Sequence, residues 1–462
     1  MELTLKKTYT ILFWVGLFFI PFNSYVGISF LGEYAQEGAI VFFLFSFFFF
    51  FLDVLFKDKF VIPYKNSYFQ LLLLFILWII LSTILNGASV LENYMKQTSG
   101  FARFFRQMIS FFIALIPFVL AYNIIHKKSI IALFYQFRKI LSASFAFVSF
   151  YAVFEILILV FNINQLEGVF RLFDFLPFVE TNLDQIFKRI SSVSFEPPFL
   201  AIYLITVAGW MFSYIVTSRK TGRFIPTLMV FILTFFSGSR TALIVVTFQF
   251  IVFLLALFVL SKKYRLLIER LLIGLVSIGL LIVIINGRTV LNAIEKKVDS
   301  LNFKENLSDN ISNRSRFGIQ YTSLLIFKEN PIMGVGFGQQ PYLARSLYPK
   351  WATNKNYEFE LWYLNDQVRS FPPGFNMYTR LLAETGIIGF LLFLSLLVSL
   401  VYQSAKWVRY KKGEEKTVAI VLLISFIGFF INWLQFDSFR VFGFWICFAI
   451  FLKLRQYSKS HE

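Results

Sequence analysis

Four arginines lie where the chain passes between polar and strongly apolar sequence. Arg189 begins RISSVSFEPP, Arg240 ends the short link SGSR, Arg316 lies in SRFGIQYTS, and Arg380 follows Asn376 by four residues. An arginine stays charged at physiological pH and binds phosphate through two parallel N–H donors. These four residues are therefore candidate catalytic groups, which would bind a phosphate or diphosphate and stabilise the negative charge that develops on it. An anchor at the membrane interface explains Arg189 equally well, and the alternative for Arg240 is a side chain that extends to that interface.

Four more residues are predicted to help bind the same substrate. Arg103 and Arg106 are three positions apart in GFARFFRQ, so they share one helix face, although binding of anionic lipid headgroups explains them equally well. Asn376 lies on the same helix face as Arg380. Arg314 is close to Arg316 and is more simply explained as a solvated charge.

A group that accepts a proton from a reacting hydroxyl would here be a carboxylate or a phenol. Glu196 in FEPP and Glu384 are the candidate bases, and Glu384 can instead pair with Arg380 one turn before it. A paired or solvated carboxylate is the commoner case, so the base stays unassigned. Further options in the polar stretch that follows are Glu358, Glu360 and Asp366.

The composition predicts that a membrane protein positions these residues. Of 462 residues, 58% are hydrophobic and only 15% are charged, whereas a soluble domain is roughly 45–50% apolar and about 25% charged. The net charge of +18 arises from short basic clusters between apolar runs. Such clusters are typical of cytoplasmic loops, so no nucleic-acid partner is expected.

Neither a metal ion nor another cofactor is expected. The two histidines and the single cysteine, Cys447, belong to no cluster with metal-ligand spacing. A lone cysteine also excludes an intramolecular disulfide.

The hydrophobicity pattern predicts an all-α, multi-pass membrane protein with about twelve transmembrane helices. A span needs about 20 mainly apolar residues, and the basic N-terminal segment is predicted to be a retained first span. The predicted spans are 9–28, 36–56, 68–86, 104–125, 133–161, 197–217, 224–238, 240–260, 266–286, 376–402, 417–435 and 438–453.

The positions of lysine and arginine predict the orientation. With the N-terminus inside, every segment on the cytoplasmic side is basic, as the positive-inside rule requires. Residues 1–286 then form nine spans with a short outer loop near 162–196, residues 287–375 form a large extracytoplasmic loop, and residues 376–462 form three spans and a cytoplasmic tail.

The stretch NPIMGVGFG in the large loop superficially resembles a dinucleotide-binding turn. Its spacing, Gly-x-Gly-x-Gly, does not match Gly-x-Gly-x-x-Gly, and it follows an amphipathic helix pattern instead of a strand. A tight turn that brings the backbone close to a neighbouring helix is the expected structure.

Five stretches together resemble the O-antigen polymerase and ligase superfamily. NPIMGVGFG is similar to the glycine segment of the family's outer loop, and the other four occur in the family's order: RISSVSFEPPFLAIYL (189–204), FFSGSRTALIVV (235–246), SRFGIQYTSLLIFKENP (315–331) and FNMYTRLLAETGIIGF (375–390).

The resemblance implies a C-type glycosyltransferase-like enzyme in the cytoplasmic membrane, with an extracytoplasmic active site. Its substrate would be an oligosaccharide linked to undecaprenyl pyrophosphate, in contact with membrane lipid, and its partners would include a flippase and a chain-length regulator. The arginines would neutralise the departing pyrophosphate without a metal ion, and the transfer is expected to invert the sugar's configuration.

One position departs from the family pattern. Ligases of the family carry a histidine before the asparagine that begins the span after the loop, but here Phe375 precedes Asn376. This favours a polymerase that joins lipid-linked repeat units of O-antigen, capsular or exopolysaccharide over a ligase that moves a finished glycan to another acceptor. A transporter or flippase is a further alternative, although the chain lacks two matching halves.

Overall fold

The structure, a computed structural model, describes residues 2–56, 60–125, 128–258, 266 and 310–459. Within these ranges all regular secondary structure is helical apart from one hairpin of two-residue strands, β1 (Tyr94–Met95) and β2 (Thr98–Ser99). Seven helices are long and apolar enough to cross a membrane: α2 (Gly38–Phe56), α3 (Ser67–Leu85), α5 (Gly100–Ile125), α6 (Ile130–Leu159), α8 (Pro197–Thr217), α10 (Arg240–Phe258) and α16 (Met377–Tyr410). The prediction of an all-α, multi-pass membrane protein is confirmed.

The other predicted spans coincide with shorter or more polar helices. These are α1 (Glu2–Phe18), α9 (Ile225–Phe236), α17 (Gly413–Asn432) and α18 (Phe442–Lys459). The predicted span 266–286 lies outside the described residues. Helix α9 has 12 residues and is about 18 Å long, which is shorter than the ~30 Å hydrocarbon core. Helix α1 ends ten residues before the predicted boundary because Pro21 cannot continue the hydrogen-bond ladder.

The helices divide into an enclosed centre and an apolar periphery. In the apolar 18-residue segment of α8, 78% of the residues are buried inside the protein, compared with 33% in the corresponding segments of α2 and α3. Trp210 on α8 and Trp445 on α18 are almost completely buried. Phe45, Phe48 and Phe51 on α2 are exposed, as expected for side chains that face lipid tails.

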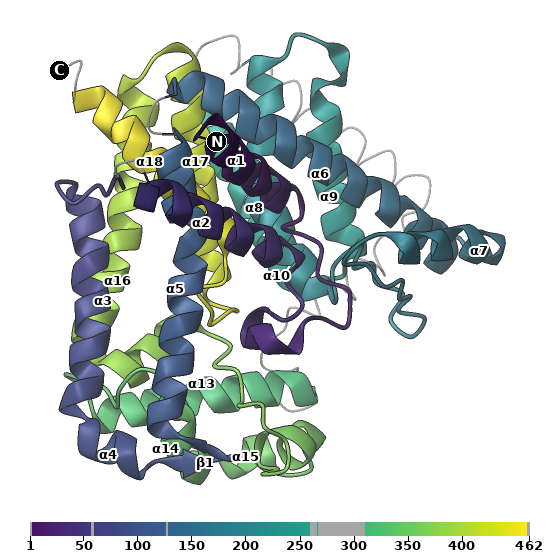
Figure 1. The fold of residues 1–462 in the computed structure, drawn as a ribbon. Helices are drawn as coiled ribbons and strands as arrows, with labels where there is room; N and C mark the ends of the chain where they lie inside the picture. Colours follow the sequence, from purple (N-terminus) through teal and green to yellow (C-terminus); the bar gives the residue numbers. More distant parts are fainter. Residues whose placement is uncertain (1, 57–59, 126–127, 259–265, 267–309, 460–462) are drawn as a thin grey trace.

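One end of the bundle carries a cap, which Figure 1 shows beneath α3 and α5. Helix α13 (Ile311–Glu329) lies across this end, and the cap also contains α14 (Gln340–Leu347), α15 (Lys350–Thr353) and one π-helical turn (Phe359–Tyr363). The helix α4 (Gly87–Glu92) and the hairpin join the cap from a distant part of the sequence. Lys96 fixes this junction, since its ammonium group donates to the carbonyls of Trp362, Asn365 and Val368.

The connector between α1 and α2 packs against the segment before α8. The N–H of Phe195 donates to the side chain of Asn23 at 2.8 Å, and Ser194 donates to the carbonyl of Pro21 at 3.0 Å. The N–H of Ile190 reaches the carbonyl of Phe236 at the end of α9. The predicted loop 162–196 is therefore packed against the bundle, and it contains the short helix α7 (Glu167–Phe170).

The basic connectors lie together at the end of the bundle opposite the cap (Figure 1). Val61 and Asn123 are hydrogen-bonded between the α2–α3 and α5–α6 connections, and Arg138 of α6 donates to Ser213 and Thr217 at the end of α8. Both chain termini lie toward this end in Figure 1. The basic residues in its described connectors and last helix include Lys65, Lys128, Arg219, Lys220, Arg223, Lys411, Lys412, Lys453 and Arg455.

Helix α16 is broken near its cap end, and the glycine-rich stretch packs against the break. Gly386 has φ 63° and ψ −168° inside the helix, a conformation that glycine adopts readily. The N–H groups of Val335 and Gly336 donate to the carbonyls of Ala383 and Glu384 at 3.0 and 2.9 Å. The stretch thus satisfies backbone groups that the break leaves without helical partners.

The positive φ values of the stretch make this close approach possible. Gly334, Gly336 and Gly338 have φ of 68°, 98° and 80°. Ser82 and Asn86 at the end of α3 hold the same stretch from the other side, through the carbonyls of Met333 and Gly334. The expectation of a tight turn packed on a neighbouring helix is confirmed by these contacts.

Substitution of Gly334 by alanine is expected to destabilise the protein. A Cβ at this position would lie 2.5 Å from the backbone of Glu384, Thr385 and Gly386, and its φ would strain any residue other than glycine. We expect a loss of at least about 2 kcal/mol, seen as a lower thermal midpoint of the detergent-purified protein. Gly168→Ala is the control, because a Cβ there meets nothing within 4 Å. Equal midpoints for the two variants would contradict the packing described.

Candidate active site at the capped end

Arg380 is the centre of a buried charged cluster near the cap. Its side chain is only 10% exposed, and its Nε lies 3.1 Å from the carboxylate of Glu384. Its Nη2 donates to Gln107 of α5 at 2.7 Å, and its Nη1 donates to the carbonyl of Asp437 at 2.8 Å. The carboxylate of Asp437 is 3.9 Å away. Arg380 is thus buried among protein partners.

Local sequence explains how α16 presents this arginine. Asn376 caps the helix by accepting the N–H groups of Tyr378 and Thr379, which satisfies two of the donors that a helix start leaves free. Arg380 and Glu384 are four residues apart and therefore adjacent on one helix face. Asp437 also accepts the N–H of Gly374 at 2.6 Å, so one carboxylate positions the chain before the helix as well as the arginine within it.

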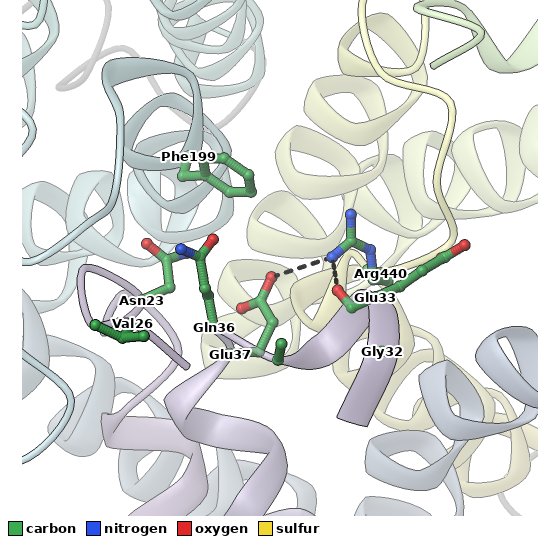
Figure 2. Close-up of a pocket in the computed structure, with 9 residues that line it drawn as sticks. Asn23, Val26, Gly32, Glu33, Gln36, Glu37, Phe199 and Arg440 are labelled. Atoms are coloured by element: carbon green, nitrogen blue, oxygen red, sulfur yellow. Dashed lines mark hydrogen bonds and ion pairs between the residues drawn. The ribbon is translucent and has the colours of Figure 1, made fainter. Parts of the chain in front are cut away.

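The cluster continues through Gln107 to the connector between α1 and α2. Gln107 donates to the carboxylate of Glu33, which also accepts a hydrogen bond of 2.9 Å from Ser110. Arg440, in the turn before α18, donates to the carbonyl of Glu33 and lies 4.0 Å from the carboxylate of Glu37. Figure 2 shows Arg440 between these two residues. Charged groups from the α1–α2 connector, the turn before α18 and helix α16 thus meet at one place.

The two carboxylates of the connector differ in their environments. Burial raises the pKa of Glu37, and the neighbouring Arg440 and Asn23 only partly oppose this rise. Burial also acts to raise the pKa of Glu33, but Arg440, Ser110, Arg380 and Gln107 outweigh it, so that the pKa of Glu33 is below its ordinary value. Paired carboxylates whose pKa values are pushed apart commonly have different roles in a site.

Arg316 has spare hydrogen-bonding capacity. It lies on α13, half-buried, and its Nε has no hydrogen-bond partner among the described residues. Its guanidinium lies 5.2 Å from the ring centre of Phe375. Phe375 itself has φ 56°, a left-handed conformation that is costly for a bulky residue and that is frequent at functional sites.

Arg189 and Arg240 lie at a separate position, at the turn between α9 and α10. Arg189 pairs with Asp184 at 3.2 Å, and its side chain packs so closely on Gly238 that a Cβ there would lie 2.8 Å away. Arg240 begins α10, half-exposed, and has no ion-pair partner among the described residues. Glu196 caps α8 from an exposed position and makes no side-chain capping bond.

The remaining predicted binding residues have protein partners. Arg103 donates to the carbonyl of Gly338 at 2.6 Å and stacks on Phe371, with 3.7 Å to the ring centre. Arg106 donates to Thr98 at 2.9 Å. Arg314 donates to the carbonyls of Asn354 and Lys355, although its Nε is unpaired.

The structure therefore joins Arg380, Glu384 and the glycine-rich stretch directly, and it places Arg189 against the turn that leads to Arg240. No recorded contact connects Arg316 with Arg240 among the described residues. Five residues of the charged cluster were not predicted from the sequence: Glu33, Glu37, Gln107, Asp437 and Arg440. Arg440 could have been found, because a charge inside the predicted span 438–453 is expensive unless it faces a site or a partner.

Comparison with known families supports the resemblance inferred from the motifs. Residues 225–394 match the family model described as O-antigen ligase. This range contains Arg240, Arg316, Arg380, Glu384 and the glycine-rich stretch, whereas Arg189 lies outside it. No curated protein matches the chain.

Removal of Arg380 is expected to unfold or loosen the capped end. The change Arg380→Ala leaves Glu384 buried without its partner, a loss that costs about 3–5 kcal/mol in buried ion pairs. The thermal midpoint of the purified protein should fall well below that of Arg369→Ala, since Arg369 is exposed and its replacement should change stability by no more than about 0.5 kcal/mol. A midpoint for Arg380→Ala equal to that of Arg369→Ala would refute this role.

Proposed function

From the premise that residues 225–394 form an O-antigen ligase domain, we propose that this multi-pass membrane protein is a polysaccharide polymerase. The family places it among the membrane enzymes of the ligase and polymerase type, which transfer glycans in polysaccharide synthesis and whose substrates are lipid-linked. The proposed reaction joins oligosaccharide repeat units carried on undecaprenyl pyrophosphate, at the outer face of the cytoplasmic membrane. The products would be O-antigen, capsular or exopolysaccharide chains.

The outer location is supported by the separation of the two ends of the bundle. The basic connectors gather at one end, and the cap with its charged cluster lies at the other. Basic loops remain on the cytoplasmic side of a membrane. The cap then faces a compartment without nucleotide-sugars, so the energy for transfer has to arrive with the substrate, in its sugar–diphosphate bond.

The proposed chemistry is an inverting displacement at the sugar. A hydroxyl of the next repeat unit attacks the anomeric carbon of the growing chain, and the bonding electrons leave with the lipid diphosphate. Arg316 is the first candidate to bind that diphosphate, because its half-buried guanidinium makes no hydrogen bond or ion pair with another described residue, whereas Arg314 donates to two carbonyls. Arg240 is the second, with Arg189 beside its turn. Guanidinium groups supply the required positive charge themselves.

Arg380 has a positioning role in this proposal. Glu384, Asp437 and Gln107 occupy its donors and balance its charge, so little of its potential is available for a diphosphate. Arg103 and Arg106 likewise have protein partners, and they would fix the glycine-rich stretch and the hairpin next to the substrate.

The choice of polymerase over ligase is supported by the surroundings of Arg316. The position before Asn376, where family ligases carry a histidine, is occupied by the ring of Phe375 against the guanidinium. A phenyl ring cannot accept a proton. A ligase remains the second candidate for this family, and it differs from a polymerase only in the acceptor that receives the glycan.

The catalytic role of Arg316 is testable with purified protein and synthetic undecaprenyl-pyrophosphate oligosaccharide. Wild type should lengthen the glycan, and Arg316→Ala should slow elongation by about 10²–10³-fold, the usual cost of one donor to a developing anion. Lys328→Ala, an exposed change on the same helix, is the control. Elongation by Arg316→Ala at the wild-type rate would contradict the proposed mechanism, and transfer only to a different acceptor would identify a ligase.

The proposed orientation can be measured by cysteine labelling in intact cells. Cys447 is buried and is replaced by serine first. Lys350→Cys in the cap should then react with a membrane-impermeant maleimide, whereas Lys412→Cys at the basic end should react only after permeabilisation. The reverse pattern would place the cap in the cytoplasm and exclude the proposed function.

A further inference from the structure

The charged cluster borders a cavity whose lining is suited to a sugar. The cavity has a volume of about 200 Å³ and lies between the α1–α2 connector, the start of α8 and the turn before α18. Asn23, Gln36 and Glu37 present amide and carboxylate groups to it, and Arg440 closes one side. Phe199 contributes an aromatic ring above these polar groups in Figure 2.

This lining favours a neutral ligand with several hydroxyl groups over an anion. Two glutamates line the cavity with a single arginine, and Arg440 already faces Glu37 and the carbonyl of Glu33. The lining therefore offers no unbalanced positive charge to a diphosphate, whereas amides and carboxylates accept and donate the hydrogen bonds that hydroxyl groups make. The volume is below the range of about 300–1,000 Å³ that is usual for drug-sized ligands, so it suits one sugar ring.

We propose that this cavity receives the terminal sugar of the acceptor, and that Glu37 is the base that takes the proton from its attacking hydroxyl. The inference rests on the proposed function and assigns the proton acceptor that the sequence left open. The hydroxyl oxygen bonds to the anomeric carbon of the donor, the bond from that carbon to the diphosphate oxygen breaks, and the electron pair leaves with the diphosphate. The proton passes to the Glu37 carboxylate and from there to water.

The geometry around Glu37 supports this assignment. Its side chain is 10% exposed, and in Figure 2 its carboxylate points between Gln36 and Arg440, beneath Phe199. Arg440 leaves its Nη2 without a partner among the described residues and is hydrogen-bonded through Nε to Ser438. Glu33, by contrast, turns its carboxylate to Gln107 and Ser110 and so connects the cavity to Arg380.

Burial determines the pH dependence of Glu37, and Arg440 and Asn23 oppose its effect only in part. The titratable groups around it are Arg440 in the turn before α18, Tyr34 in the short helix η1 (Ser29–Tyr34) and Tyr25 in the connector, and Glu33 lines the same cavity. Because burial raises the pKa of Glu37 above its ordinary value, the carboxylate form is lost at a higher pH than for a solvated glutamate. Elongation should therefore decline as the pH falls through this raised pKa.

The test compares Glu37→Gln with wild type on the same synthetic donor and acceptor. Glutamine keeps the shape but cannot take the proton, so kcat should fall by about 10²–10⁴-fold, with an unchanged KM for the donor and without the decline at low pH. Glu37→Asp should restore part of the rate and the pH limb. Glu92→Gln, an exposed carboxylate outside the cavity, is the matched control and should behave as wild type.

The outcomes separate this inference from the proposed function. If wild type does not elongate the glycan, the proposed function fails. If wild type elongates it and Glu37→Gln has the wild-type rate and pH profile, only the assignment of Glu37 fails.

Should Glu37→Gln not fold, Phe199→Ala tests the cavity: the KM for the acceptor should rise about tenfold, as a lost stacking contact of ~1–1.5 kcal/mol predicts, while the KM for the donor stays constant. An unchanged acceptor KM would overturn the sugar site.

Discussion

A guanidinium group buried between helices requires acceptors and negative charge around it, and Arg380 gathers these from distant parts of the chain. Glu384 comes from its own helix, Gln107 from α5, and Asp437 from the turn between α17 and α18. Isolated buried charges are very costly, so these elements have to meet for the chain to fold. The relative placement of α5, α16 and α18 at the capped end therefore depends on this one side chain.

The broken helix α16 connects this buried arginine to the cap. Arg380 and Glu384 lie on the short segment before Gly386, and the carbonyl of Glu384 accepts the N–H of Gly336 from the glycine-rich stretch. Arg103 binds the carbonyl of Gly338 in the same stretch. The bunched glycines thus serve close backbone packing, and they connect the charged cluster rigidly to α13, which carries Arg316.

The sequence was sufficient for features that depend on local properties. Apolar runs predicted helices near the observed ones, with α8 matching the predicted 197–217 at both boundaries, because hydrophobicity over 20 residues is a property of the segment itself. The pairing of Arg380 with Glu384 was likewise readable as a four-residue spacing. Helix α1 is shorter than its apolar run because Pro21 has no backbone N–H, a property that hydrophobicity does not measure.

Contacts between remote segments could not be predicted in this way. Glu33 and Arg440 are 407 positions apart, and neither belongs to a motif that the sequence analysis used. The hairpin at residues 94–99 belongs to the cap only because the carbonyls of Trp362, Asn365 and Val368 collect around Lys96. Such partners are determined by packing in three dimensions, for which a single sequence carries no local signal.

The position of Phe375 links the missing histidine to the cavity beside Arg440. Phe375 has a left-handed backbone conformation and holds its ring against Arg316, so a group that cannot accept a proton stands where family ligases carry a histidine. Glu37 supplies a buried carboxylate elsewhere in the capped end, and the chain from Glu37 through Arg440, Glu33 and Gln107 to Arg380 is continuous. In an inverting displacement the base and the diphosphate lie on opposite faces of the sugar, so the base need not contact the diphosphate-binding arginines, which would hold it as a carboxylate of low proton affinity. A base surrounded by amides and one arginine retains the higher pKa that proton transfer from a sugar hydroxyl requires.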